Sequence, residues 1–180
     1  LLKPFSYDEF SDHLEQLAVK LLKPSDVSGL IKEARRSLAK KDYKEARQIA
    51  EKAMATNPKS AQAFLILGKT AFFEGDTESA IDFLKRAIDT NDMFVEAHST
   101  LLEVFLKMDS KASIYQTSRK LYELSPDNPK YSLVLAGSYL ERHEYDKSEE
   151  HYKIALRHAP SLLEAYKGLG YVYLKKDELE

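Results

Sequence analysis

The stretch AQAFLILGKTAFFEGDTESAIDFLKRAIDTND, residues 61–92, has the same arrangement of small, large apolar and turn-forming residues as the stretch that follows it, VEAHSTLLEVFLKMDSKASIYQTSRKLYELSP, residues 95–126. The two stretches are related by a shift of 34 residues. A fixed period of this length is the sequence signature of a repeat protein. The period therefore predicts an array of similar structural units.

Small residues recur at fixed places of this period. The eighth place holds Ala34, Gly68, Leu102, Ala136 and Gly170, and the twentieth place holds Ala46, Ala80, Ile114 and Ser148. A small residue lets two antiparallel helices approach closely, whereas a bulky side chain would overpack the contact by roughly 1–3 kcal/mol. Because glycine inside a helix costs about 1 kcal/mol relative to alanine, we expect Gly68 and Gly170 to lie where two helices touch. The large Leu102 and Ile114 predict less regular packing in the third unit.

These residues resemble the tetratricopeptide repeat family, whose 34-residue helix-turn-helix units carry small residues at the eighth, twentieth and twenty-seventh places and proline at the thirty-second. That last place holds Pro58, Asp92, Pro126 and Pro160. The resemblance covers Val27 to about Lys176 and implies an all-α fold, a right-handed superhelical solenoid of about four and a half helical hairpins. The implied repeats are 27–60, 61–94, 95–128 and 129–162, with a half repeat at 163–180, preceded by one extra helix within residues 1–22 and a linker at 23–26.

In this family the first helix of each repeat lines a concave groove that binds other proteins. The resemblance places in the groove the basic residues Arg35, Lys69 and Lys167, together with Leu38, Leu65, Phe72, Phe73, Leu106, Leu140 and Tyr171. The apolar members have two interpretations that stay open at this point. They are buried between adjacent first helices, or they form a trough for a peptide or an amphipathic helix that the basic residues orient.

Composition excludes several classes of function. A formal net charge of −2 and a pI near 6.3 argue against nucleic-acid binding, which requires clustered positive charge. No stretch approaches the roughly 18 consecutive apolar residues of a membrane span, and no signal-peptide pattern is present. The chain has no cysteine, so thiolate chemistry and disulfides are absent. We therefore expect a cytoplasmic protein without a membrane or nucleic-acid partner.

The chain offers few residues suited to catalysis. Five histidines, His13, His98, His143, His151 and His158, are the candidates for acid-base or metal chemistry near neutral pH. His151 and His158 share a helical face, but no third ligand stands at the spacing that a metal site needs. Nucleotide-binding and metalloprotease motifs are absent. We expect no enzymatic activity, no metal and no cofactor.

The first ten residues, LLKPFSYDEF, differ from the repeats. They resemble the end of a response-regulator receiver domain, where a strand closes on a Lys-Pro pair before a final helix; by that resemblance Lys3 and Pro4 are the matching residues. Residues 6–22 predict an amphipathic helix, with Phe10, Leu14, Leu17 and Leu21 on one face.

Two hypotheses of function follow. The first is the output region of a bacterial two-component response regulator, controlled by a receiver domain that precedes it in a longer chain. The second is a free-standing adaptor for the assembly or secretion of a protein complex, in which the first helix only caps the array. Self-association is a further possibility, because the ends of a cut solenoid expose apolar helix faces.

Overall fold

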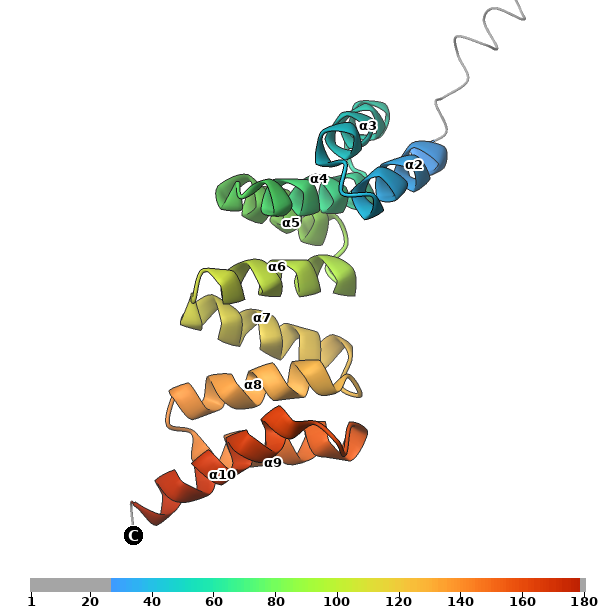
Figure 1. The fold of residues 1–180 in the computed structure, drawn as a ribbon. Helices are drawn as coiled ribbons and strands as arrows, with labels where there is room; N and C mark the ends of the chain where they lie inside the picture. The colour runs from blue at the N-terminus through green and yellow to red at the C-terminus, as the bar shows by residue number, and fades with distance from the viewer. Residues whose placement is uncertain (1–26, 179–180) are drawn as a thin grey trace, which may run out of the picture.

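The computed structural model describes residues 27–178, and within that range the regular structure is entirely helical (Figure 1). Four hairpins follow one another: α2 (Val27–Ala39) with α3 (Tyr43–Thr56), α4 (Ala61–Glu74) with α5 (Thr77–Thr90), α6 (Val95–Lys107) with α7 (Lys111–Leu124), and α8 (Pro129–Glu141) with α9 (Tyr145–His158). A final helix, α10 (Leu163–Asp177), stands after them. We call α2, α4, α6, α8 and α10 the A helices and the others the B helices. The predicted all-α solenoid of helical hairpins is confirmed.

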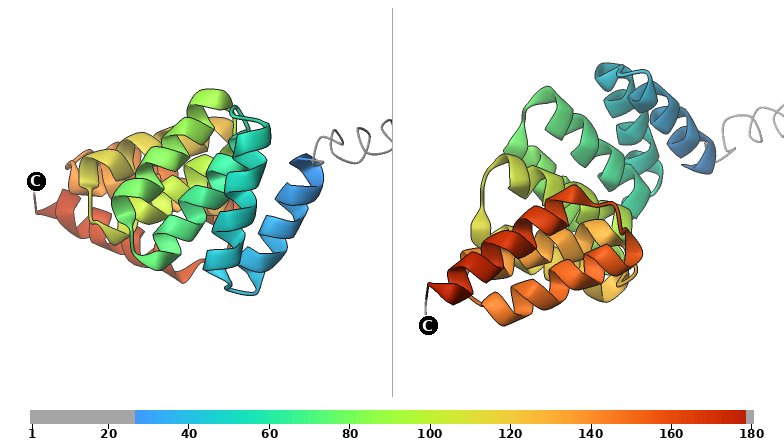
Figure 2. Two further views of the ribbon diagram at one scale, coloured as in Figure 1. Left: turned by 90° about the horizontal axis from the view of Figure 1, so that it is seen from above. Right: turned by 60° about the horizontal axis from the view of Figure 1, so that its bottom comes forward.

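The hairpins stack along one direction, so that α2 and α10 lie at opposite ends of the array (Figures 1 and 2). Each helix packs against its neighbours in sequence, and A helices of adjacent repeats also touch at α2–α4, α4–α6 and α8–α10. No helix within residues 27–178 has both the length and the apolar composition needed to cross a membrane.

Helix boundaries follow capping residues. Ser60 accepts a hydrogen bond from the backbone N–H of Ala63, and Asp76 accepts one from Ser79, which satisfies a free N–H of the first turn of α4 and of α5. The turn between the two helices of a hairpin needs one residue in the left-handed conformation at the fifteenth repeat place. Gly75 adopts it at no steric cost, with φ of 89°. The equivalent residues of the other hairpins adopt the left-handed conformation although each carries a side chain: Lys41, Asp109 and His143, at φ of 63°, 51° and 58°.

Gly68 of α4 lies where two helices touch, as predicted. A Cβ on Gly68 would lie 2.7 Å from Leu84 Cγ of α5, so the two helices approach too closely for a side chain. The prediction for Gly170 is wrong, because a Cβ there would meet nothing within 4 Å and no helix within residues 27–178 covers it. The glycine of α10 that does make a close contact is Gly168, where a Cβ would lie 2.2 Å from Tyr152 Cζ.

The A helices α6 and α8 lie farther apart than the other neighbouring A helices, since no Cα atom of α6 is within 8 Å of one of α8. The core at this junction is small and centres on Leu102, Leu121 and Tyr131. Ile114 of α7 lines a hollow of about 610 Å³ between α6 and α8, at the repeat place where other units have alanine or serine. The bulkier side chain agrees with the predicted irregularity of the third repeat.

Candidate protein-binding groove

A hollow of about 500 Å³ opens where α4 and α6 run side by side, and we call it the α4–α6 hollow. It brings together four residues predicted to line a groove: Leu38, Lys69, Phe72 and Phe73. The rest of its lining comes from the third and fourth repeats: Val95, Glu96, Ser99, Thr100, Glu103 and Tyr131. The hollow therefore combines side chains from four successive A helices.

One wall of the hollow is aromatic. Phe73 is 53% exposed, and its ring stacks on that of Tyr43 from α3, with the centroids 5.2 Å apart and the planes 15° apart. Phe72, which is half-buried and packs against the core, lies 5.7 Å from Phe73 between ring centroids. We call Tyr43, Phe72 and Phe73 the aromatic platform. The Phe73 ring lies between those of Tyr43 and Phe72, so little of its side-chain entropy remains to be lost when another surface covers it.

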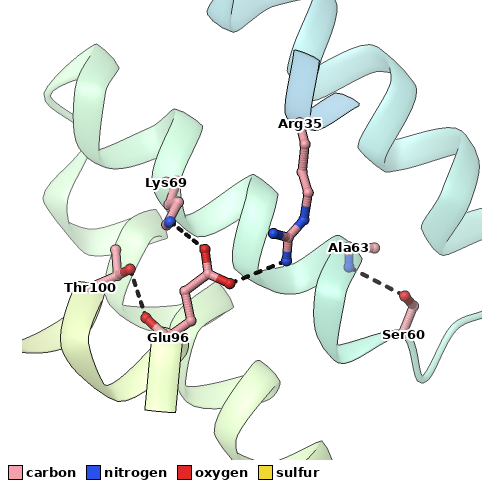
Figure 3. A network of polar contacts seen from close by, with 6 residues as sticks. All are labelled: Arg35, Ser60, Ala63, Lys69, Glu96 and Thr100. Carbon is pink, nitrogen blue, oxygen red and sulfur yellow. Dashed lines mark hydrogen bonds and ion pairs between the residues drawn. The ribbon is translucent and has the colours of Figure 1, made fainter. Parts of the chain in front are cut away.

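Two of the three basic residues predicted for the groove, Arg35 and Lys69, are already paired. The third, Lys167 of α10, is exposed and lines none of the hollows described here. Figure 3 shows Glu96 of α6 between Arg35 of α2 and Lys69 of α4. Arg35 Nη2 donates to Glu96 Oε2 at 3.1 Å, and Lys69 Nζ donates to Glu96 Oε1 at 2.7 Å. This charged triad joins three successive A helices.

The triad also sets the ionisation of its carboxylate. Burial of Glu96 favours the neutral acid, but the hydrogen bond and charge of Lys69, together with those of Arg35, outweigh burial and hold the pKa of Glu96 below its ordinary value. Glu96 therefore stays charged at neutral pH. The sequence prediction missed this residue, although it lies on the first helix of its repeat, the helix that the resemblance places along the groove.

The other predicted groove residues are dispersed. Leu65 is buried, with 1% of its surface exposed, so the prediction that it lines the groove is wrong. Leu106, which is 46% exposed, lines the hollow between α6 and α8. Leu140 and Tyr171 line a third hollow, of about 360 Å³, formed by α8, α9 and α10. Apart from Leu65, the apolar residues predicted for the groove are thus divided among three hollows. Lys3 and Pro4 lie outside the described residues.

The histidines of residues 27–178 do not contact one another, and each has different neighbours. His98 Nε2 lies 2.9 Å from the carbonyl oxygen of Asp92, and His143 Nδ1 lies 2.9 Å from the Tyr145 hydroxyl. His151 packs between the rings of Tyr122 and Tyr139. Residues 27–178 hold no group of three or more histidine or carboxylate side chains arranged to bind a metal ion. The hollows, rather than a titratable cluster, are the features suited to a functional contact.

Known proteins match both the sequence and the fold. Two models of the tetratricopeptide repeat match residues 37–103 and 133–180, together more than half of the chain. The chain is 27% identical over 146 residues to the TPR repeat-containing protein YpiA of Bacillus subtilis (strain 168), covering 81% of this chain and 34% of that protein. It is 25% identical over 132 residues to the human protein O-mannosyl-transferase TMTC1, covering 71% of this chain and 15% of that protein. The chain thus spans about a third of one relative's length and about a seventh of the other's.

Solved structures share the same architecture. YrrB, described as a TPR protein with an unusual peptide-binding site, superposes with a TM-score of 0.77 at 15% identity, over 90% of this chain and 83% of that one. A crystal structure of MamA gives a TM-score of 0.72 at 22% identity, over 84% of this chain and 82% of that one. Together with the 34-residue spacing of the A helices, these matches show that the chain belongs to the tetratricopeptide repeat family.

Proposed function

We propose that the chain is an adaptor that binds a peptide or a helix of another protein at the α4–α6 hollow. The observation that carries the proposal is the aromatic platform: Phe73 is 53% exposed, yet its ring is fixed by stacking on Tyr43 beside a hollow of about 500 Å³. Rigid exposed aromatic side chains are typical of the residues that dominate protein interfaces. The description of YrrB as having a peptide-binding site supports the same use of this fold.

The experiment begins with a display library of random dodecapeptides, from which binders of the 180-residue chain are selected. Their affinities are then measured for the wild-type chain and for Phe73→Ala. We expect Phe73→Ala to weaken binding about fivefold or more, because truncating an interface aromatic costs more than about 1 kcal/mol. Met93→Ala is the matched control, since Met93 is a large exposed apolar residue outside the lining of the hollow. Equal affinities for wild type and Phe73→Ala would contradict the proposal.

A second proposal is the output region of a two-component response regulator. It depends on Lys3, Pro4 and the predicted helix at residues 6–22, which lie outside the described residues. None of the relatives described above is named as a response regulator. The adaptor is therefore the better supported of the two proposals. Purified receiver domains, added in phosphorylated form, should change peptide affinity only if the second proposal holds.

A further inference from the structure

We infer that the α4–α6 hollow selects a partner segment that carries a lysine or arginine next to an apolar side chain, with Glu103 as the residue that pairs with the cation. The inference rests on the proposed function, because it names the chemistry of the partner at the same groove. It depends on which charges of the hollow are already neutralised and which are not.

Three charged residues line the hollow: Lys69, Glu96 and Glu103. Lys69 pairs with Glu96 at 2.7 Å, and Arg35 donates to the other oxygen of the same carboxylate. Glu103 is exposed and, among residues 27–178, has no ion-pair or hydrogen-bond partner. Glu103 is therefore the one charged residue of this lining that has no partner among residues 27–178.

The surroundings of Glu103 suit a cation in particular. Lys107 stands one turn after Glu103 on α6, the spacing at which opposite charges commonly pair. Its ammonium instead lies 5.1 Å from the centroid of the Phe72 ring, which shows that this wall accepts a positive charge over an aromatic face. Phe73 offers a second, more exposed ring beside it. Glu103 lines the same hollow as Phe72 and Phe73, and a carboxylate together with aromatic faces can bind guanidinium and ammonium groups.

An acidic segment fits the hollow less well. The two cations of the triad, Arg35 and Lys69, both donate to Glu96, so an incoming carboxylate competes with an internal one for them. The incoming carboxylate would also lie near Glu103, and two like charges opposite each other in an interface repel. The apolar part of the segment is accommodated by Leu38, Phe72 and Phe73, which line the same hollow.

The test uses the dodecapeptides selected on the wild-type chain. We expect lysine and arginine to be enriched beside large apolar residues in the selected sequences. The peptide that binds most tightly is then prepared in two forms, with its basic residue kept or replaced by glutamine, and both are titrated by fluorescence anisotropy. Glu103→Gln should weaken the basic form about tenfold and should leave the glutamine form within about twofold.

A matched control separates local pairing from the general charge of the protein. Glu51→Gln removes one exposed carboxylate from the B helix α3, away from the lining of the hollow, and should leave both peptides within about twofold. Because Glu103 is exposed, Glu103→Gln should fold normally, and circular dichroism verifies this.

The outcomes distinguish the two proposals. If selected peptides lose affinity with Phe73→Ala but show no basic enrichment, or carry acidic residues instead, the adaptor stands and the inference about the partner is overturned. Equal effects of Glu103→Gln and Glu51→Gln overturn it as well. Failure to select any peptide that depends on Phe73 overturns both.

Discussion

Leu84 of α5 lies directly against the backbone of α4 at Gly68, where an added Cβ would stand 2.7 Å from Leu84 Cγ and 3.3 Å from the carbonyl oxygen of Ala80. The hairpin is therefore held at a separation that only glycine permits. Gly68 and Gly170 both occupy the eighth place of their repeats. Within residues 27–178 a second helix covers Gly68 but not Gly170.

Gly68→Ala should destabilise the protein. Overpacking costs roughly 1–3 kcal/mol, and the better helix propensity of alanine offsets about 1 kcal/mol of it, so we expect a net decrease of about 1 kcal/mol in the free energy of unfolding. Gly170→Ala is the control, and it should raise the free energy of unfolding by up to about 1 kcal/mol, because nothing opposes its Cβ. Urea denaturation measures both; a loss of stability in the Gly170 variant would contradict this account.

Lys41→Gly should stabilise the protein even though it removes a side chain. Lys41 adopts φ of 63° in the turn between α2 and α3, a conformation that costs a residue with a Cβ roughly 1 kcal/mol. Glycine relieves this strain and loses part of the gain through the greater entropy of the unfolded chain, which leaves a net increase of about 0.5 kcal/mol. Arg36→Gly, an exposed site inside α2, should instead lower stability by about 1 kcal/mol. Thermal denaturation of both variants provides the comparison.

Stability should decrease on acidification through His151. Burial between Tyr122 and Tyr139 lowers the pKa of His151, against the opposing charge of Glu150. The Nδ1 of His151 is buried and has no hydrogen-bond partner among residues 27–178. The unfolded chain, with an ordinary histidine pKa of about 6.5, therefore binds a proton more readily than the folded protein does. The free energy of unfolding should fall as pH decreases below about 6.5.

His151→Phe keeps an aromatic ring in the same place and removes the titrating group. We expect the variant to lose less stability than the wild type between pH 7.5 and pH 5.5 in urea titrations. Identical pH dependence in the two proteins would show that the ring of His151 takes up its proton as easily in the folded state as in the unfolded one.

Replacing Glu96 by glutamine should have a small, salt-dependent effect. Arg35 and Glu96 keep 44% and 41% of their side-chain surface exposed, so solvent screens much of the attraction. We expect Glu96→Gln to lower the free energy of unfolding by less than about 1 kcal/mol in low salt, and the difference to shrink in 0.5 M NaCl. Because the pKa of Glu96 is lowered, its contribution is present above the pKa of an unfolded glutamate and is lost as pH falls through the folded value.

The period of the sequence was enough to predict the fold, because helix boundaries and small packing residues obey local rules that repeat every 34 residues. The groove was harder to predict. Leu65 shares a helix with Phe72 and Phe73, yet it faces the core, since a residue's place in one helix does not specify how the neighbouring helices are rotated against it. The Arg35–Glu96–Lys69 triad depends on the distance between three helices, which the sequence does not state.

The outer face of α10 shows how this architecture grows. Tyr166, Gly170 and Tyr173 are exposed, although they hold the repeat places at which α4 buries Phe64, Gly68 and Ala71. An antiparallel amphipathic helix that places a leucine against Gly170, as α5 places Leu84 against Gly68, should pack on this face. Attaching one behind α10, for example a copy of the α5 sequence, should elongate the array without rebuilding any existing interface, so concatenation by gene duplication requires only that the new junction keep the same phase.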